Sequence, residues 1–337
     1  MPEPQLTALP QIPDQARHWG QLYVSARSLA IAEYAANHQE LVVVIVPGMH
    51  ELVQLEAEIR FYADPALPLT TFTDWETLPY DLISPHQDII SERIRSLYLL
   101  PQTHRGILLV AASGLMQRLT PRSFLEQYAL IIKAGDRLTP EDFRERLVDG
   151  GYRHVTQVEE HGEFAVRGSI IDLFPMASSK PFRVDFFDDE IDSIRAFDPE
   201  TQLTVEKHEQ LELLPAHEFP LNADGIKKFR HSFRNTFDAA SKNCSLYRSV
   251  SDGNAPAGIE YYTPLFFEHM ATLFDYLPEQ CHFLQLEGSR PAMENFWQSV
   301  QDRYEERRHD IERPILPPPD LYNPPEQTLA ELQRHRL

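Results

Sequence analysis

The stretch LVVVIV at Leu41–Val46 is a continuous apolar run in which most residues are β-branched. It follows an Ala-rich helical pattern, ARSLAIAEYAAN at 26–37, and precedes a Pro-Gly turn and a second helical pattern at 50–63. Two further strand patterns, LPLTTFT at 67–73 and GILLVAA at 106–112, flank a helical pattern at 91–102. Buried strands that alternate with helices are typical of a parallel sheet covered on both faces. The first third of the chain is therefore predicted to be α/β.

The pattern changes near Tyr128. Strand patterns and turn residues dominate from there, with clear alternation in FRVDFF at 182–187. Helical patterns return after Pro220, and the chain ends in the Pro-rich RPILPPPDLYNPPEQ at 313–327, which suits a linker or a surface strap. We expect an α/β segment over 1–127, a small α+β domain over 128–215 and a returning segment over 216–337.

Composition limits the class of protein. The 337 residues include 51 acidic and 31 basic side chains, a formal net charge of −20, which disfavours a stand-alone DNA-binding protein although a local basic patch could exist. Only two cysteines occur, at 244 and 281, and their spacing indicates neither a disulfide framework nor a zinc site. The N-terminus lacks the pattern of a secretion signal, and the apolar runs are too short to span a membrane. We expect a soluble, cytoplasmic protein.

A possible phosphate site lies in GQLYVSARS at 20–28. Arg27 and Ser28 mimic the Lys-Ser pair of a phosphate-binding loop, but the glycines are missing, and the side chains of Val24 and Ala26 would obstruct the cradle. A plain helix start with Ser25 as its cap is the favoured interpretation.

Other catalytic or metal sites find little support in the sequence. His154 and His161 bracket Glu159 and Glu160, but the spacing matches no strong ligand signature, so a solvated polar turn is expected. Neither cysteine has the context of a nucleophile. We therefore predict no catalytic residue, no metal and no cofactor, although folding could still bring distant groups together.

The strand FRVDFF carries the one functional signal found in the residues themselves. Alternation puts Val184 and Phe186 on a core face and Arg183, Asp185 and Phe187 on the opposite face. Exposed arginine and aromatic side chains are common anchors of protein interfaces. Two interpretations are equally balanced: an interface, or a Phe187 packed under a loop with Arg183 paired to Asp185 or Asp188.

Several long motifs also carry a family resemblance. They occur in order along the chain: DWETLPYDLISPHQDIISERI at 74–94, HGEFAVRGSIIDLFP at 161–175, RVDFFDDEIDSIRAFD at 183–198, LLPAHEFP at 213–220, PAGIEYYTPLFF at 256–267 and LFDYLP at 273–278. They resemble the N-terminal module of the bacterial transcription-repair coupling factors, which is itself similar to the first part of the excision-repair helicase UvrB. The resemblance covers nearly the whole chain and only the front of such a protein, so we expect a piece of a longer one.

The resemblance implies a UvrB-like α/β fold. A degenerate RecA-type parallel-sheet domain (1a) would be completed by a late segment (1b), with a small α+β domain 2 inserted between them. It places the nucleotide-site positions of UvrB on Val24, Ala26, Arg27 and Ser28, and its acidic motif on the segment from Glu287 and Gly288 to Arg290. A glycine in place of the catalytic glutamate leaves no group to orient water. The damage-clamping hairpin of UvrB is shortened here to residues 75–88.

Domain 2 is the part through which UvrB and the coupling factors bind UvrA. The resemblance places the contacts on Arg167, Arg183 and Phe187. For Arg167 the alternative is an internal ion pair with Glu163. In the full-length proteins RNA polymerase, DNA and the C-terminal region, which masks this face, are further expected partners. A non-catalytic recruitment module is therefore the expectation. The alternatives are a residual nucleotide-binding, helicase-like module and a DNA-binding module.

Overall fold

The computed structural model describes residues 19, 20, 22, 25–237 and 244–334. Its first sheet has four parallel strands in the order β12 (Cys281–Gln285), β1 (Leu41–Val46), β3 (Gly106–Ala111) and β2 (Leu69–Phe72). Leu41 lies opposite Gly106 on one side and Cys281 on the other, so a strand from late in the chain completes the sheet. The expected α/β parallel-sheet domain, completed by the returning segment, is confirmed.

Both faces of this sheet are covered, which explains the continuous apolar run at Leu41–Val46. Helices α1 (Ser25–Ala36) and α2 (Met49–Tyr62) pack over Val42 and Val44. The opposite face, with Val43 and Ile45, belongs to a second core that includes α3 (Gln87–Leu99), α4 (Ala112–Met116) and α9 (Ser289–Arg307). All six residues of β1 are buried.

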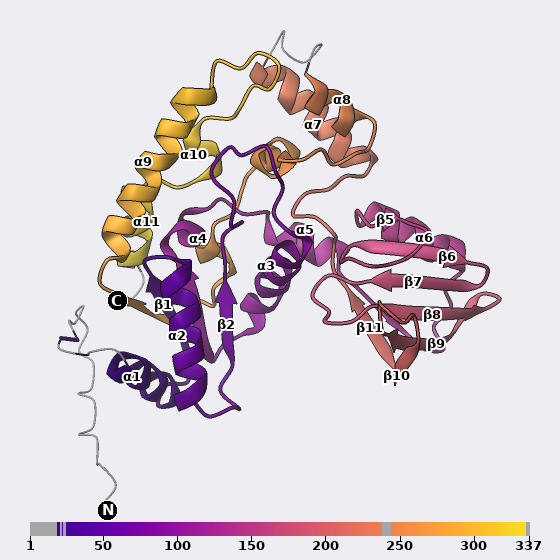
Figure 1. Ribbon diagram of the computed structural model, residues 1–337, viewed down its shortest axis with the longest axis horizontal. Helices are drawn as coiled ribbons and strands as arrows, with labels where there is room; N and C mark the ends of the chain where they lie inside the picture. The colour runs from indigo at the N-terminus through magenta and orange to yellow at the C-terminus, as the bar shows by residue number, and fades with distance from the viewer. Residues whose placement is uncertain (1–18, 21, 23–24, 238–243, 335–337) are drawn as a thin grey trace, which may run out of the picture.

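The inserted domain is built on a six-stranded sheet, seen on the right of Figure 1. Its order is β10 (Thr204–His208), β9 (Glu190–Phe197), β8 (Phe182–Phe187), β7 (Ile170–Phe174), β6 (Glu163–Arg167) and β5 (Arg153–His154). All neighbours are antiparallel except β5 and β6. Helix α6 (Pro140–Asp149) packs on one face, with the ring of Phe143 5.8 Å from that of Phe186.

The chain enters and leaves this domain through one two-stranded ribbon. Strand β4 (Leu130–Lys133) pairs antiparallel with β11 (Gln210–Leu213). The expected limits of 128–215 enclose both strands, and the division of the chain into three segments stays a prediction.

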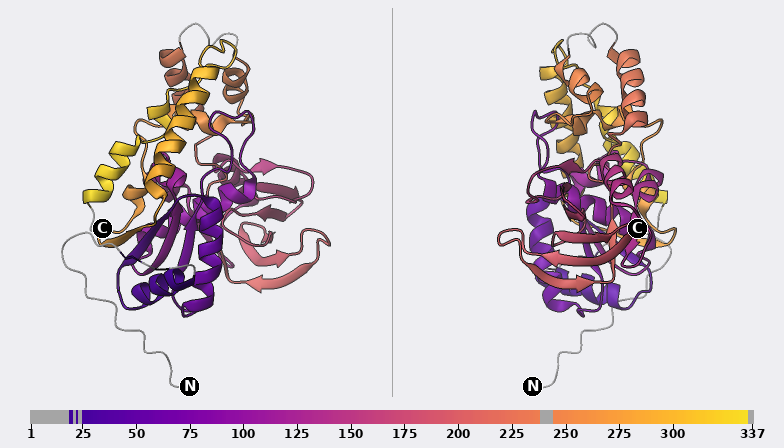
Figure 2. Two further views of the ribbon diagram at one scale, coloured as in Figure 1. Left: turned by 60° about the vertical axis from the view of Figure 1, so that its left-hand side comes forward. Right: turned by 90° about the vertical axis from the view of Figure 1, so that its right-hand side faces the viewer.

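The returning segment is mostly helical, and its α7 and α8, coloured orange, lie at the top of both views in Figure 2. Besides β12 and α9, this segment contains α7 (Ala223–Phe237), α8 (Ser245–Ser251), η3 (Ile259–Phe266), η4 (Leu273–Tyr276), α10 (Pro318–Leu321) and α11 (Pro325–Arg334). Two short elements lie earlier in the chain, η1 (Leu100–Gln102) and α5 (Arg122–Tyr128). Among the described residues, no helix combines the length and apolar character needed to cross a membrane.

The Pro-rich segment at 313–327 is packed as a strap, the second of the two expected alternatives. Leu316, Leu321 and Tyr322 are buried. The backbone N–H of Arg118 donates to the carbonyl oxygen of Leu321 (2.8 Å), and that of Asn323 donates to the carbonyl oxygen of Met116 (2.7 Å). Proline keeps the segment extended while its apolar side chains cover the core.

A buried polar cluster joins the segment directly after the inserted domain to the first domain. Arg93 Nε on α3 lies 2.8 Å from Glu218 Oε1, and the indole N–H of Trp75 donates to Glu218 Oε2 (2.9 Å). The Arg93 guanidinium also donates to the carbonyl oxygen of Thr73 and lies 4.7 Å from the ring centroid of Phe72. Because both charged side chains are buried away from water, the ion pair between them offsets the cost of removing each charge from solvent.

Candidate partner-binding face of the inserted domain

Strand β8 separates a core face from an outer face as its alternation predicts. Val184 is 0% exposed and Phe186 5%, whereas Phe187 is 79% exposed. Arg183 and Asp185 are half-buried on the same side as Phe187. The predicted assignment of the two faces is confirmed, and the alternative that Phe187 packs under a loop is wrong.

A tight turn holds Phe187 at the edge of this face. Phe187 pairs with Glu190, so only Asp188 and Asp189 connect β8 to β9. Asp188 adopts φ 56°, a left-handed conformation that aspartate tolerates better than most residues. The acidic turn therefore has a structural role: it reverses the chain directly after Phe187.

Arg183 is held within the sheet by a bidentate ion pair with Asp172. Its Nε and Nη2 donate to the two carboxylate oxygens at 2.7 and 2.9 Å, and its guanidinium lies 5.1 Å from the ring centroid of Phe197. The bond to Asp172 raises the pKa of Arg183. The expected partners Asp185 and Asp188 are wrong, because Asp185 pairs instead with Ser193 and Arg195.

Arg167 ends β6 and is exposed on the same outer face. It lies opposite Ile170, which lies opposite Asp185 of β8. Its Nη2 donates to the carbonyl oxygen of Thr156 at 3.3 Å, and no other hydrogen bond or ion pair of its guanidinium is found among the described residues.

The alternative of an ion pair between Arg167 and Glu163 is wrong. Glu163 is buried, forms an ion pair with Arg153, and accepts backbone N–H groups from Glu159 and Glu160. Since both oxygens of Glu163 are engaged, it holds the 153–163 segment rather than Arg167.

The outer face is thus defined by Arg167, Arg183 and Phe187. It combines a large exposed apolar ring, an exposed cation and a half-buried cation. Such a surface can bury an aromatic anchor in an apolar recess of another protein while the arginines bind its carboxylates.

The two halves of the predicted degenerate nucleotide site lie apart. Val24 is outside the described residues. Ser25 opens α1, Ala26 is exposed, Arg27 is half-buried, and the buried hydroxyl of Ser28 donates to Glu58 late in α2.

In the second half, Glu287 is exposed and Gly288 adopts φ 86° before α9. A Cβ on Gly288 would lie 3.3 Å from Pro47, which precedes α2. Because a helix rises ~1.5 Å per residue, roughly 14 Å of α2 separate its start from Glu58. Ser28 therefore contacts the C-terminal half of α2, whereas Gly288 lies beside the loop that precedes this helix.

The histidines considered as metal ligands have separate surroundings. His161 contacts Asp88 (2.8 Å) and the carbonyl oxygen of Ser178 (2.7 Å), so the expected solvated turn is wrong for this residue. His154 packs against Phe164 with ring centroids 5.0 Å apart and the rings tilted by 31°. Within the residues that the structure describes, no three His, Cys, Asp or Glu side chains form a group suited to a metal ion.

Comparison with known proteins identifies the family of the inserted domain. Residues 130–219 match the model of the UvrB interaction domain, and this range contains Arg167, Arg183 and Phe187. The chain is 47% identical over 315 residues to the transcription-repair-coupling factor of Haemophilus influenzae. The chain is a UvrB-homology module of the transcription-repair-coupling factor family.

Further relatives carry the same name. The coupling factor of Escherichia coli is 44% identical over 99% of the chain, and that of Rickettsia prowazekii is 31% identical over 81% of it. The chain spans 27% of the Haemophilus protein and 29% of the Escherichia protein. The match therefore concerns one part of these longer proteins.

The ion-pair partner of Arg183, Asp172, was not predicted from the sequence. Asp172 interrupts the apolar strand IIDLF and is 1% exposed. A lone carboxylate in a buried strand needs a cationic or hydrogen-bonding partner. An aspartate within this apolar run could therefore have predicted that such a partner exists. Register across β7 and β8, where Asp172 lies opposite Arg183, identifies the partner.

Proposed function

We propose that this chain is a non-catalytic recruitment module that binds UvrA through the outer face of its inserted domain. Phe187 would enter an apolar recess of UvrA, and Arg167 would bind a carboxylate beside it. Arg183 would contribute its remaining N–H groups while Asp172 holds it in place.

The observation that carries the proposal is the exposure of Phe187. A phenylalanine that is 79% exposed contributes nothing to the core, yet the fold projects it from a two-residue turn. It lies within the range that matches the UvrB interaction domain. An exposed aromatic beside arginine is the usual composition of an interface hot spot.

The non-catalytic part of the proposal rests on the separated nucleotide-site positions. Ser28 is committed to Glu58, and Ser289, next to Gly288, donates to the carbonyl oxygen of Ile45 at 2.9 Å. These contacts favour a structural role for both hydroxyl groups. ATPase and translocase activity would belong to other parts of a full-length coupling factor.

In such a full-length, cytoplasmic protein the module would bring nucleotide excision repair to stalled RNA polymerase on DNA. The protein's own C-terminal region would mask the outer face until the motor engages DNA. Both statements extend the proposal beyond the residues of this chain.

The proposal is tested by titrating UvrA with the wild-type chain and with Arg167→Glu. Charge reversal at an exposed interface cation should weaken binding by about tenfold or more. Arg60→Glu is the matched control, because Arg60 is an exposed arginine on α2 and 58% of its side chain is accessible. If the folded wild-type chain does not bind UvrA, the recruitment function is wrong.

The alternative of a residual ATP- and DNA-binding module predicts a different result. ATP turnover that Arg27→Ala abolishes would support it, as would tight DNA binding with a steep salt dependence. The recruitment proposal predicts neither turnover nor such binding.

A further inference from the structure

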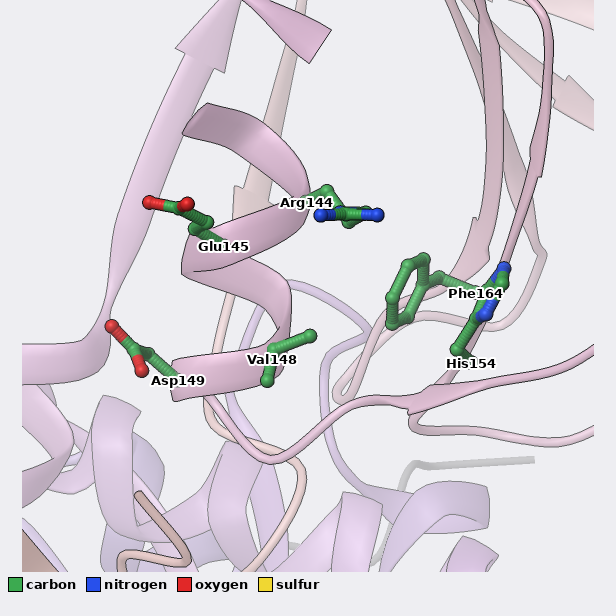
Figure 3. Close-up of a pocket in the computed structure, with 6 residues that line it drawn as sticks. All are labelled: Arg144, Glu145, Val148, Asp149, His154 and Phe164. Atoms are coloured by element: carbon green, nitrogen blue, oxygen red, sulfur yellow. The ribbon is translucent and has the colours of Figure 1, made fainter. Parts of the chain in front are cut away.

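A groove lies at the end of the inserted sheet, between α6 and the edge strand β5 (Figure 3). Its cavity volume is about 310 Å³. The residues that line it are Arg144, Glu145, Val148, Asp149, His154 and Phe164.

The side chains that face across the groove are cationic and apolar. Figure 3 shows Arg144 and Val148 pointing from α6 toward Phe164 and His154, whereas the carboxylates of Glu145 and Asp149 point to the other side of the helix. Val148 is 53% exposed. Within the described part of the chain, no side-chain hydrogen bond or ion pair of Arg144 is found. A free guanidinium therefore stands beside an accessible apolar surface.

The backbone of β5 offers a second recognition element. The N–H groups of Arg153 and Val155 both donate toward β6, to the carbonyl oxygens of Gly162 and Phe164, at 2.8 Å. Because successive N–H groups along a strand point in alternate directions, the N–H and C=O of His154 point to the free edge. An edge strand beside a groove is a template for an added strand.

This groove is distinct from the outer face. Helix α6 packs through Phe143 against Phe186, on the face of the sheet opposite to Phe187. A ligand in the groove would therefore leave Phe187 accessible.

We propose that the groove between α6 and β5 binds an extended peptide segment that carries an aspartate or glutamate two residues from an aliphatic residue. The peptide would exchange backbone hydrogen bonds with His154, bind Arg144 through its carboxylate, and bury its aliphatic side chain against Val148 and Phe164. This function goes beyond the docking of UvrA on the outer face.

The spacing of the motif follows from the geometry of the two elements. Arg144 and Val148 are one helical turn apart, which separates their Cβ atoms by about 6 Å. Side chains two residues apart on a strand share one face and lie roughly 7 Å apart. A carboxylate and an aliphatic side chain at this spacing can therefore meet Arg144 and Val148 together.

Two fluorescein-labelled pools of eight-residue peptides test the proposal. In the first pool Asp or Glu alternates with Val, Ile or Leu through a spacer residue, and in the second pool Lys replaces the acidic residues. Fluorescence anisotropy with the whole chain should show about tenfold or greater preference for the acidic pool. Equal binding of both pools, or no binding of either, would overturn the proposal.

Variants on α6 locate the binding site. Arg144→Glu and Arg144→Gln should each weaken binding of the acidic pool by about tenfold or more. Arg146→Glu changes the same helix outside the groove and should leave binding unaltered. The acidic pool should also slow hydrogen exchange at the His154 amide. Equal loss with Arg144→Glu and Arg146→Glu, or loss with Phe187→Ala, would contradict the assigned groove.

Discussion

Two arginine clusters, one at the junction of the domains and one on the outer face, differ mainly in exposure. Arg93 is buried with Glu218 and Trp75. Arg167 is exposed, and within the part of the chain that the structure describes its side chain makes a single hydrogen bond of 3.3 Å, to a backbone oxygen. The same side chain thus stabilises the fold where water is excluded and remains available to a partner where water is present.

Arg183 lies between these extremes. Its side chain is 19% exposed, and its bidentate partner Asp172 is buried. Replacing it would disturb both the fold and the outer face, so binding data on Arg183 variants mix two effects. Phe187 and Arg167 are the cleaner probes of the interface.

The largest expected effect is on the junction. Arg93→Ala leaves the Glu218 carboxylate buried without a cation and should lower the free energy of unfolding by about 3–5 kcal/mol. Urea denaturation measures this loss. Arg95→Ala is the control, because Arg95 is exposed on the same helix and should cost less than about 0.5 kcal/mol. Similar losses in the free energy of unfolding for Arg93→Ala and Arg95→Ala would contradict the claim that burial makes Arg93 the more stabilising arginine.

A buried carboxylate near the junction should make stability depend on pH. Burial raises the pKa of Glu260 from 4.5 to about 7, while Ser84 donates to its carboxylate at 2.9 Å. Between pH 4.5 and 7 the folded chain therefore binds more protons at this group than the unfolded chain does. The contribution of Glu260 to stability is present below pH 4.5 and is lost as pH rises through 7.

Glu260→Gln should remove this dependence. The pKa difference of about 2.5 corresponds to about 3 kcal/mol, so the variant should gain about that much stability relative to wild type between pH 4.5 and 8. Thermal unfolding at both pH values measures the gain. A constant difference between variant and wild type across this range would show that Glu260 does not titrate as described.

Arg183→Ala should have an intermediate effect on stability. It leaves Asp172 without its bidentate partner, and partial exposure of the site limits the expected loss to about 2 kcal/mol. Arg183→Lys restores the charge but not the paired geometry and should recover only part of this loss. Full recovery by lysine would mean that charge alone matters at this position.

The smallest expected effect on stability is at Arg167. Arg167→Ala removes one hydrogen bond on an exposed side chain and should change the free energy of unfolding by less than about 0.5 kcal/mol. Urea denaturation of Arg167→Ala and Arg93→Ala in parallel compares the free energies of unfolding of the two variants directly. A loss above about 1 kcal/mol would assign Arg167 a structural role.

Local sequence patterns predicted the structural features that follow from hydrophobic periodicity, namely the buried strands and the two faces of β8. Continuous apolar runs identified the buried parallel strands, and alternation in β8 separated Phe186 from Phe187. Both patterns arise from side-chain direction, which the backbone geometry of a strand fixes by itself. Patterns alone also indicated a separate α+β domain after Tyr128 and placed Arg183 and Phe187 on one face, whereas Arg167 and the role in partner binding depended on family resemblance.

Long-range partners could not be predicted from the same patterns. Arg93 and Glu218 are 125 residues apart in the chain, and nothing local indicates that they meet. The pairing of Arg183 with Asp172 depends on the register of two strands, and the packed Pro-rich strap depends on the core that it covers. Each is a tertiary contact, which composition and spacing do not encode.

The central claim is that Phe187 acts as an anchor for UvrA. The chain offers a matched control, since Phe61 on α2 is 81% exposed and Phe187 is 79% exposed. Titration calorimetry of UvrA with Phe187→Ala should show a loss of about thirtyfold in affinity, or about 2 kcal/mol, at an unchanged melting temperature. Phe61→Ala should bind as wild type does. Equal affinities for the two variants would contradict the account.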